Sequence, residues 1–264
     1  MKLCTIASGS SGNVSMVRTD STVLLTDCGI SCKRVVDGMK SQGADPGTLS
    51  GIMITHEHSD HISGLRVFLK KYRIPVFATA RTIDAILSVP GMEEVDRSLF
   101  NAVRKEEAFS IGDITAKCFE IPHDAADPVG WTYEHESSKV SVCTDIGTPT
   151  DTIRENLTGS NAMVIEANHD VRMLEAGSYP YALKCRILSD TGHLSNENSG
   201  KLISEIWDEN MKYIFLGHLS KENNLPQIAL AAVKNEMERD HEGYEKYTVI
   251  RAAERAVPME AVAV

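Results

Sequence analysis

Long apolar runs are absent from this sequence of 264 residues. No stretch approaches the roughly 20 consecutive apolar residues that a membrane-spanning helix requires, so no membrane is expected among its partners. The segment from Met1 to Gly9 becomes polar too early for the apolar core of a signal peptide. We therefore expect a cytoplasmic protein.

Basic residues are also scarce. The chain has 27 Lys and Arg against 37 Asp and Glu, which gives a formal net charge of −10. Proteins that coat nucleic acid are usually basic, so a broad electrostatic grip on DNA or RNA is disfavoured. Bound divalent ions or local basic patches can still recruit a phosphate chain, so the charge does not exclude nucleic acid as a substrate.

Disulfide frameworks and interdomain linkers are likewise missing. Most of the six cysteines lie in or beside apolar strand-like runs, where a thiol behaves as a small hydrophobe. Cys28 and Cys32 lack the spacing of a zinc knuckle. The composition, 42% hydrophobic and 24% charged, suits a globular protein. Since no segment rich in Pro, Ser or Gly divides the chain, residues 1–264 are predicted to form a single α/β domain.

The sequence does contain a dense group of metal-ligand side chains after a short apolar run. His56 and His58 occupy alternate positions, so in an extended loop both project to one side and can bind one ion. Asp60 and His61 follow, and apolar residues at helical spacing predict a helix over 62–72. Three imidazoles and a carboxylate this close would cost solvation and repel on protonation unless a cation organised them.

The same arrangement recurs at other predicted strand ends. An apolar strand is followed at once by a ligand-type residue at four places, His56, His123, Asp145 and His218. Rigid strand ends are where α/β scaffolds most readily assemble a site, so these residues are expected to converge. Asp27 also ends a predicted strand, and we expect its carboxylate to brace the histidine loop instead of binding an ion.

A short internal repeat singles out one further histidine. Residues 192–198 and 217–223 agree at six of seven positions, and each segment precedes a predicted helix. One interpretation is two similar helix starts with a Ser at or near the N-cap. The other is a histidine, His193 in the first copy and His218 in the second, presented twice toward one cavity.

The spacing His-x-His-x-Asp-His over 56–61, followed by His123, Asp145 and His218 in this order, resembles the metallo-β-lactamase superfamily. The resemblance implies a four-layer αβ/βα sandwich with the site at one edge of two packed sheets. It also implies a metal-dependent hydrolase. Every matched ligand position carries the usual residue, which argues against a non-catalytic copy.

Donor geometry divides these ligands between two ions. The first ion is predicted to bind His56, His58 and His123, and the second Asp60, His61 and His218, with the two oxygens of Asp145 shared between them. Imidazole suits zinc, and a mixed set with two carboxylates also admits manganese or iron. Water between two ions roughly 3.5–4 Å apart loses its proton near neutral pH and becomes a nucleophile, which Asp60 would orient.

Four further segments indicate one branch of this superfamily. They are residues 8–13, 165–170, 192–196 and 218–224. Together they resemble the YycJ/WalJ-like branch, which implies a metal-dependent 5′→3′ DNA exonuclease. The order also resembles the transfer-RNA 3′-processing nucleases, in which a His before the last ligand helps to protonate the leaving oxygen. By that analogy His193 is the predicted general acid, oriented by Glu166 or His169. No separate RNA-binding arm is evident in the sequence, so DNA is favoured over RNA.

Candidate substrate contacts rest on residue type alone. They are Ser10, Ser11 and Asn13 in the first loop, His169, and the basic residues Lys184 and Arg186. The first loop is rich in glycine and hydroxyls and can present backbone N–H groups to a phosphate. An ordinary hairpin connection between two strands explains that loop equally well.

Two other functions are compatible with these residues. A hydrolase of the same fold that opens a thioester, lactone or β-lactam would use the same ligands but has less need of a distant imidazole acid. A regulatory or structural module that keeps its ions for stability would need metal to fold and would cleave no phosphodiester. His193 is the residue that discriminates among them. The sequence carries no indication of the oligomeric state.

Overall fold

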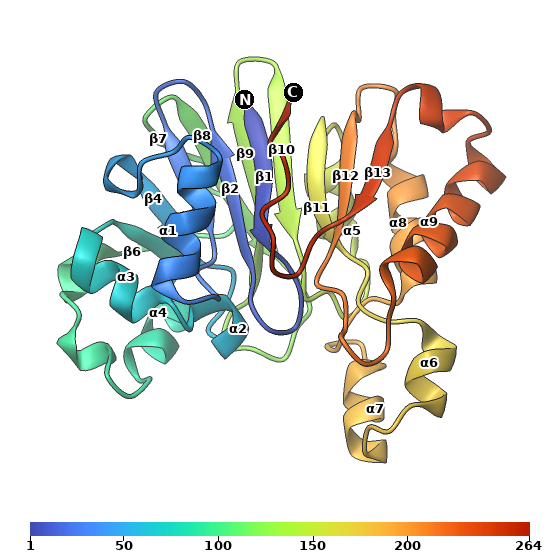
Figure 1. Ribbon diagram of the computed structural model, residues 1–264, viewed down its shortest axis with the longest axis horizontal. Helices are drawn as coiled ribbons and strands as arrows, with labels where there is room; N and C mark the ends of the chain where they lie inside the picture. Colours follow the sequence, from blue (N-terminus) through green and yellow to red (C-terminus); the bar gives the residue numbers. More distant parts are fainter.

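The computed structural model describes residues 1–264 as two seven-stranded sheets packed face to face, with helices on both outer faces (Figure 1). The first sheet has the order β14 (Val262–Ala263), β1 (Lys2–Ala7), β2 (Val14–Arg18), β3 (Val23–Thr26), β4 (Gly51–Met53), β5 (Val76–Thr79) and β6 (Phe100–Val103). The second has the order β13 (Val249–Ala252), β12 (Tyr213–Gly217), β11 (Ala162–Glu166), β10 (Ser138–Cys143), β9 (Val129–His135), β8 (Ile114–Glu120) and β7 (Phe109–Ile111).

The helices connect these strands. They are α1 (Cys32–Ser41), α2 (Ser59–Ile62), α3 (Leu65–Tyr72), α4 (Ala80–Leu87), α5 (Asp151–Leu157), α6 (Val171–Ala176), α7 (Tyr181–Ile187), α8 (Asn196–Ile206) and α9 (Pro226–Asp240). Four short 3₁₀ helices, η1 (Pro46–Thr48), η2 (Met92–Glu94), η3 (Arg97–Leu99) and η4 (Tyr244–Lys246), complete the chain. No helix is both long and apolar enough to cross a membrane.

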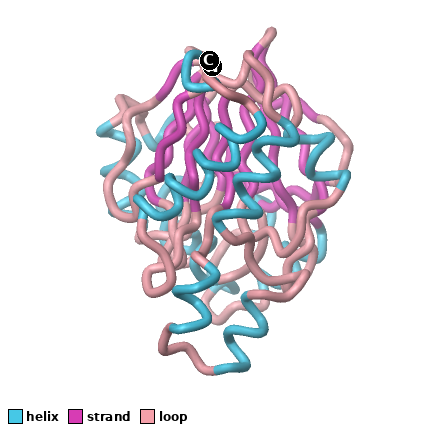
Figure 2. The backbone as a smooth tube through the Cα atoms, turned by 90° about the vertical axis from the view of Figure 1, so that its right-hand side faces the viewer, coloured by secondary structure: helices cyan, strands magenta, loops and turns pink.

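Both sheets follow the same plan. The pairs from β14 to β3 and from β7 to β10 are antiparallel, whereas those from β3 to β6 and from β10 to β13 are parallel. The carboxyl ends of parallel strands point to one edge of a sheet, where α/β proteins place their ligands. Figure 2 shows loops gathered below the strands at this edge, and the two chain ends lie together at the opposite edge.

Three apolar cores separate the four layers. One lies between the first sheet and α1, α3 and α4, one between the two sheets, and one between the second sheet and α5, α8 and α9. Strand β11 shows how the sequence builds them, because side chains alternate across a sheet. Ala162 and Val164 join the central core, and Met163 and Ile165 join the outer one. The predicted αβ/βα sandwich is confirmed.

The predicted helix over 62–72 is wrong in one respect, because it is broken into α2 and α3 at Gly64. The Gly64 backbone N–H donates to the Cys28 carbonyl at 2.9 Å. A Cβ on Gly64 would lie 1.9 Å from the Ile30 carbonyl oxygen. The chain therefore needs glycine here to pass the loop after β3, and this contact between distant segments ends the short helix that carries Asp60 and His61.

Trp131 links the central core to the functional edge. Its side chain is fully buried between the sheets, and its indole N–H donates to the Ile54 carbonyl at 3.2 Å, just before the histidine loop. Trp131→Ala is expected to lower the free energy of unfolding by about 3–5 kcal/mol, because it leaves a large cavity. Urea denaturation measures this loss. Tyr181→Ala, at a side chain that is 81% exposed, is the control, and a loss below about 1 kcal/mol for Trp131→Ala would contradict the packing described here.

Candidate metal centre

The predicted ligands meet at the edge of the sandwich where the parallel strands end. His56 and His58 lie in the loop after β4, and Asp60 and His61 lie in α2. The others follow strands of the second sheet, with His123 after β8, Asp145 after β10 and His218 after β12. Side chains from both sheets thus converge on one place.

The first group of donors consists of His56, His58 and His123, which each offer a ring nitrogen within 4.8 Å of the others. The Nδ1 atom of His123 lies 3.1 Å from the Gly192 carbonyl, so this nitrogen carries the proton. The opposite nitrogen, Nε2, then points its lone pair into the group, 3.3 Å from His58 Nδ1.

The second group consists of Asp60, His61 and His218. Asp60 Oδ2 lies 3.2 Å from His218 Nε2 and 3.6 Å from His61 Nε2. Asp145 lies between the two groups, with Oδ2 at 3.3 Å from His61 Nε2 and Oδ1 at 3.7 Å from His123 Nε2. Its two oxygens therefore face both sets of imidazoles.

Two buried atoms in this cluster have no hydrogen-bond partner, His56 Nε2 and Asp145 Oδ2. Leaving buried polar atoms unpaired is costly, and a cation between them would satisfy both. Burial, reinforced by the neighbouring His61, lowers the pKa of His56 well below its ordinary value. A neutral imidazole is the form that binds metal. The residues thus fit divalent metal ions of the kind that imidazole and carboxylate donors prefer.

The Asp27 carboxylate is bonded to the histidine loop. Its Oδ2 accepts from His61 Nδ1 at 2.7 Å, and its Oδ1 accepts from the Thr55 N–H at 2.9 Å. Burial opposes protonation of His61, but the carboxylates of Asp145 and Asp27 outweigh it and raise the pKa of His61 well above its ordinary value. Because Nδ1 donates to Asp27, the opposite nitrogen of His61 is directed at Asp60 and Asp145.

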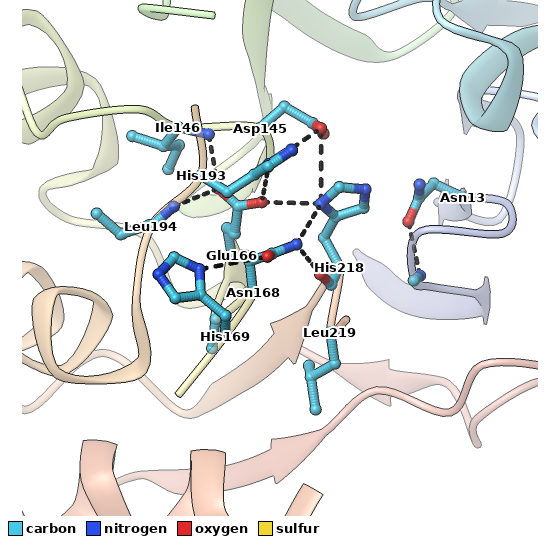
Figure 3. Close-up of polar contacts among 12 residues, drawn as sticks. Asn13, Asp145, Ile146, Glu166, Asn168, His169, His193, Leu194, His218 and Leu219 are labelled. Atoms are coloured by element: carbon cyan, nitrogen blue, oxygen red, sulfur yellow. Dashed lines mark hydrogen bonds and ion pairs between the residues drawn. The ribbon is translucent and has the colours of Figure 1, made fainter. Parts of the chain in front are cut away.

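Glu166 holds the two histidines of the sequence repeat (Figure 3). Its Oε1 accepts from His193 Nδ1 at 2.9 Å and from His218 Nδ1 at 2.8 Å. Its Oε2 accepts from the backbone N–H groups of Ile146 and Leu194 at 2.7 and 3.0 Å. Burial raises the pKa of Glu166, but the charge of His193 and the bonds from both imidazoles outweigh it, so the pKa falls to about 2. The two histidines of the repeat therefore share one carboxylate oxygen.

Asp145, Glu166, His193 and His218 also lie close enough to form a ligand group. Within this group both imidazoles already donate a hydrogen bond from Nδ1 to one Glu166 oxygen. Burial lowers the pKa of His193, but the charge of Glu166 outweighs it and raises that pKa above its ordinary value. His193 is thus bound to a carboxylate and keeps Nε2 free.

The repeat differs at its helix starts. Ser195 is the N-cap of α8 and accepts from the Asn198 N–H at 3.2 Å, as expected. Its counterpart Ser220 accepts from the Asn223 N–H, but α9 begins only at Pro226 without a side-chain cap. The N-cap interpretation is therefore right for the first copy and wrong for the second.

Three residues of the centre have left-handed backbone conformations. The φ angles of Asp27, Asp145 and His218 are 64°, 62° and 55°, and each residue follows a strand by one or two positions. Such conformations cost about 1–3 kcal/mol for residues other than glycine and cluster at functional sites. The sharp turns place these side chains where the chain leaves the sheet.

The candidate substrate contacts lie in different surroundings. Ser10 and Ser11 are exposed in the loop after β1. Asn13 is buried, accepts from the Gly9 N–H at 2.9 Å, and lies 3.2 Å from His61 Nε2, so it faces the centre from within the protein.

His169, Lys184 and Arg186 lie on the other side of the centre. His169 is buried and contacts Asn168 instead of His193, and burial lowers its pKa to about 4. Lys184 in α7 donates to the Glu175 carbonyl, and Arg186 donates to Asp124 beside His123. Glu166, and not His169, is thus the residue that orients His193.

Several neighbours of the centre were not predicted. Asn168 donates to the His218 carbonyl at 2.9 Å, and the Ser8 hydroxyl accepts from the His218 N–H at 2.9 Å. Helices α6 and α7 project from the body of the protein beside this edge (Figures 1 and 2). No residue pattern in the sequence predicts these contacts. Asn168 does lie beside His169, and Ser8 begins the 8–13 segment.

Comparison with known proteins places this centre in a family. Residues 22–214 match the β-lactamase superfamily domain. The chain belongs to this superfamily. It is 39% identical to the exodeoxyribonuclease YycJ of Bacillus anthracis over 88% of each chain. It is 36% identical to the exodeoxyribonuclease WalJ of Streptococcus pneumoniae, over 89% of this chain and 88% of that one.

Solved structures of the superfamily share the fold at low identity. Zn²⁺-bound PqqB from Methylobacterium extorquens superposes with a TM-score of 0.75 at 13% identity, covering 98% of this chain and 100% of that one. The short form of human tRNase Z superposes with a TM-score of 0.66 at 14% identity, covering 100% and 99% of the two chains. These structures support the four-layer fold independently of the sequence relatives.

The brace on His61 provides a first test of the centre. In Asp27→Asn the side-chain amide would donate to His61 Nδ1, which moves the imidazole proton to the nitrogen that faces Asp60 and Asp145. We expect metal affinity to fall about 10–100-fold, as is usual when the outer partner of a ligating histidine is lost. Competition with a chelating dye measures the affinity. Asp84→Asn on the exposed face of α4 is the matched control, and equal affinities of the two variants would disprove the bracing role.

Proposed function

We propose that this chain is a metal-dependent phosphodiesterase, and more specifically a 5′→3′ DNA exonuclease. The observation that carries the proposal is His193, an imidazole beside the ligand groups whose Nδ1 is held by Glu166 at 2.9 Å. Relatives named as exodeoxyribonucleases, 36–39% identical over most of the chain, support the same activity. A DNA substrate also agrees with the cytoplasmic location expected from the sequence.

Seven side chains would hold two ions. We assign His56, His58 and His123 to one ion, Asp60, His61 and His218 to the other, and Asp145 to both. When bound, the two ions would polarise a phosphate oxygen and supply an activated water for in-line attack at phosphorus. Zinc and manganese are the ions we propose, and iron also suits these donors.

The protein's own residues would then perform three tasks. Asp60 is 22% exposed at its side chain, so its carboxylate can accept a hydrogen bond from the attacking water and orient it. Glu166 accepts a hydrogen bond from the Nδ1–H group of His193 and thereby directs Nε2 toward the substrate. His193 would donate its Nε2 proton to the departing oxygen, a contribution that is typically worth 10²–10⁴-fold in rate.

Four of the six candidate phosphate contacts expected from the sequence keep that role, and the other two, Asn13 and His169, are assigned a different one. We propose that Ser10 and Ser11 bind a neighbouring phosphate and that Arg186 and Lys184 neutralise the strand beyond it. His169 and Asn13 are buried, and we assign them to support of the centre.

A panel of small substrates tests the reaction class. Protein loaded with zinc or manganese should hydrolyse bis-p-nitrophenyl phosphate and should be far less active toward a thioester, a lactone and a β-lactam. The same panel run with each metal and with DNA and RNA oligonucleotides identifies the preferred ion and strand. Hydrolysis of the thioester or lactone without any turnover of the phosphodiester would refute the proposal.

A further inference from the structure

A hollow of about 200 Å³ lies directly beside the metal centre and has no role in the mechanism above. Its lining combines polar residues, among them Glu57, Ser59 and Arg66, with the apolar residues Ile62, Val89 and Met92. We call this hollow the base pocket. We propose that it receives the nucleobase of the nucleotide that adjoins the cleaved phosphodiester, an inference that rests on the proposed nuclease function.

The position of the base pocket follows from the histidine loop. Glu57 lies between the ligands His56 and His58, and Ser59 follows immediately. Glu57 and Ser59 line the pocket, so the pocket and the ligands share one loop. We place the base in this pocket because the phosphate of the same nucleotide would lie at the ligands carried by the same loop.

The size and lining of the pocket suit one base. Drug-sized ligands occupy pockets of roughly 300–1,000 Å³, so a smaller hollow fits a single ring system and not a longer segment of a strand. Val89 and Met92 offer apolar contact to the faces of a ring. Arg66 is 42% exposed and pairs with Glu94 at 3.1 Å, and its planar guanidinium is of the kind on which unpaired bases stack.

Glu57 supplies an unfilled hydrogen-bond acceptor. Its Oε1 accepts from the Ala126 N–H at 2.8 Å, which fixes the side chain. Its Oε2 is buried and has no partner. A buried acceptor without a donor is costly, and the amino group of cytosine or adenine would supply the missing donor. Uracil and thymine present a carbonyl oxygen at the corresponding position, which a carboxylate repels.

Cytosine and uracil nucleotides therefore give a matched test, because they have the same size and differ only at C4, which bears an amino or a carbonyl group, and at the adjacent N3, which bears a proton only in uracil. Calorimetry on the metal-loaded protein would measure the binding of dCMP, dUMP and the base-free 2-deoxyribose 5-phosphate. We expect dCMP to bind about tenfold more tightly than dUMP, the discrimination typical of one specific base-edge contact. Oligonucleotides that end in cytosine or uracil should show the same preference in KM, with similar kcat.

Two variants separate the edge contact from the pocket itself. In Glu57→Gln the amide can donate to the uracil carbonyl, so the preference for dCMP should disappear or reverse. In Val89→Trp, at a position 37% exposed, an indole should fill the pocket and reduce the binding of both nucleotides to that of the sugar phosphate. Glu155→Gln on the exposed side of α5 should keep the wild-type preference.

The outcomes distinguish this inference from the proposed function. Strand cleavage with equal affinities for dCMP, dUMP and the sugar phosphate would overturn the base pocket and leave the nuclease function intact. A preference that survives in Val89→Trp would also overturn it. If no strand is cleaved, the nuclease function fails, and the calorimetric comparison still decides whether the pocket binds a base.

Discussion

Replacing His193 with glutamine is expected to lower kcat for DNA cleavage by about 10²–10⁴-fold. The imidazole lies beside both ligand groups, is held by Glu166 at Nδ1, and has no other hydrogen-bond partner in its surroundings. Glutamine preserves approximate size and polarity but cannot donate a proton to an alkoxide leaving group. Single-turnover cleavage of a DNA oligonucleotide measures the loss without interference from product release.

The leaving group distinguishes a proton donor from a structural residue. p-Nitrophenolate is a stable anion that needs little protonation, so His193→Gln should slow bis-p-nitrophenyl phosphate hydrolysis by about tenfold or less. His135→Gln, at the end of β9, is the matched control and should have no effect on either substrate. Equal losses for DNA and for the ester would mean that His193 supports the metal centre and does not act as a general acid.

Asp145→Ala is expected to lower metal affinity more than about 100-fold and to abolish cleavage. Loss of a residue that only supports a ligand typically costs 10–100-fold in affinity, and Asp145 itself faces the imidazoles of His61 and His123 at 3.3 and 3.7 Å. Its removal leaves closely packed imidazoles without the carboxylate that lies between the two groups. This change should therefore affect both ions at once.

Metal content after gel filtration in the presence of a chelator measures this effect. The unmodified protein should retain about two ions per chain, and Asp145→Ala fewer than one, as determined by elemental analysis. Asp84→Ala on α4 controls for the loss of a carboxylate and should retain both. Full metal content in Asp145→Ala would show that the two ligand groups do not share this residue.

Strand ends made much of this centre predictable. Apolar runs that stop at His56, His123, Asp145 and His218 imply strands whose ends face one edge, and the structure brings these residues together. The four-layer sandwich followed from the family resemblance. One local helix signal was also correct, since Ser195 of the repeat is the N-cap of α8.

Other features depend on contacts that no local pattern encodes. The break at Gly64 arises because the loop after β3 passes within contact distance of its backbone. The left-handed conformations of Asp145 and His218 are imposed by the surrounding fold, since only a few per cent of residues other than glycine adopt positive φ, even though Asp and His do so more often than most. The base pocket joins the histidine loop to a segment some thirty residues later, so it exists only in the folded chain.

The most direct test of a two-metal nuclease centre is digestion of end-labelled DNA by zinc- or manganese-loaded protein beside Asp60→Ala. A 5′→3′ exonuclease should release a 5′ label at once as a mononucleotide and shorten a 3′-labelled strand stepwise, and Asp60→Ala should do neither. Strands that stay intact with either metal, or that are degraded equally by Asp60→Ala, would contradict the assignment of this centre as a two-metal nuclease.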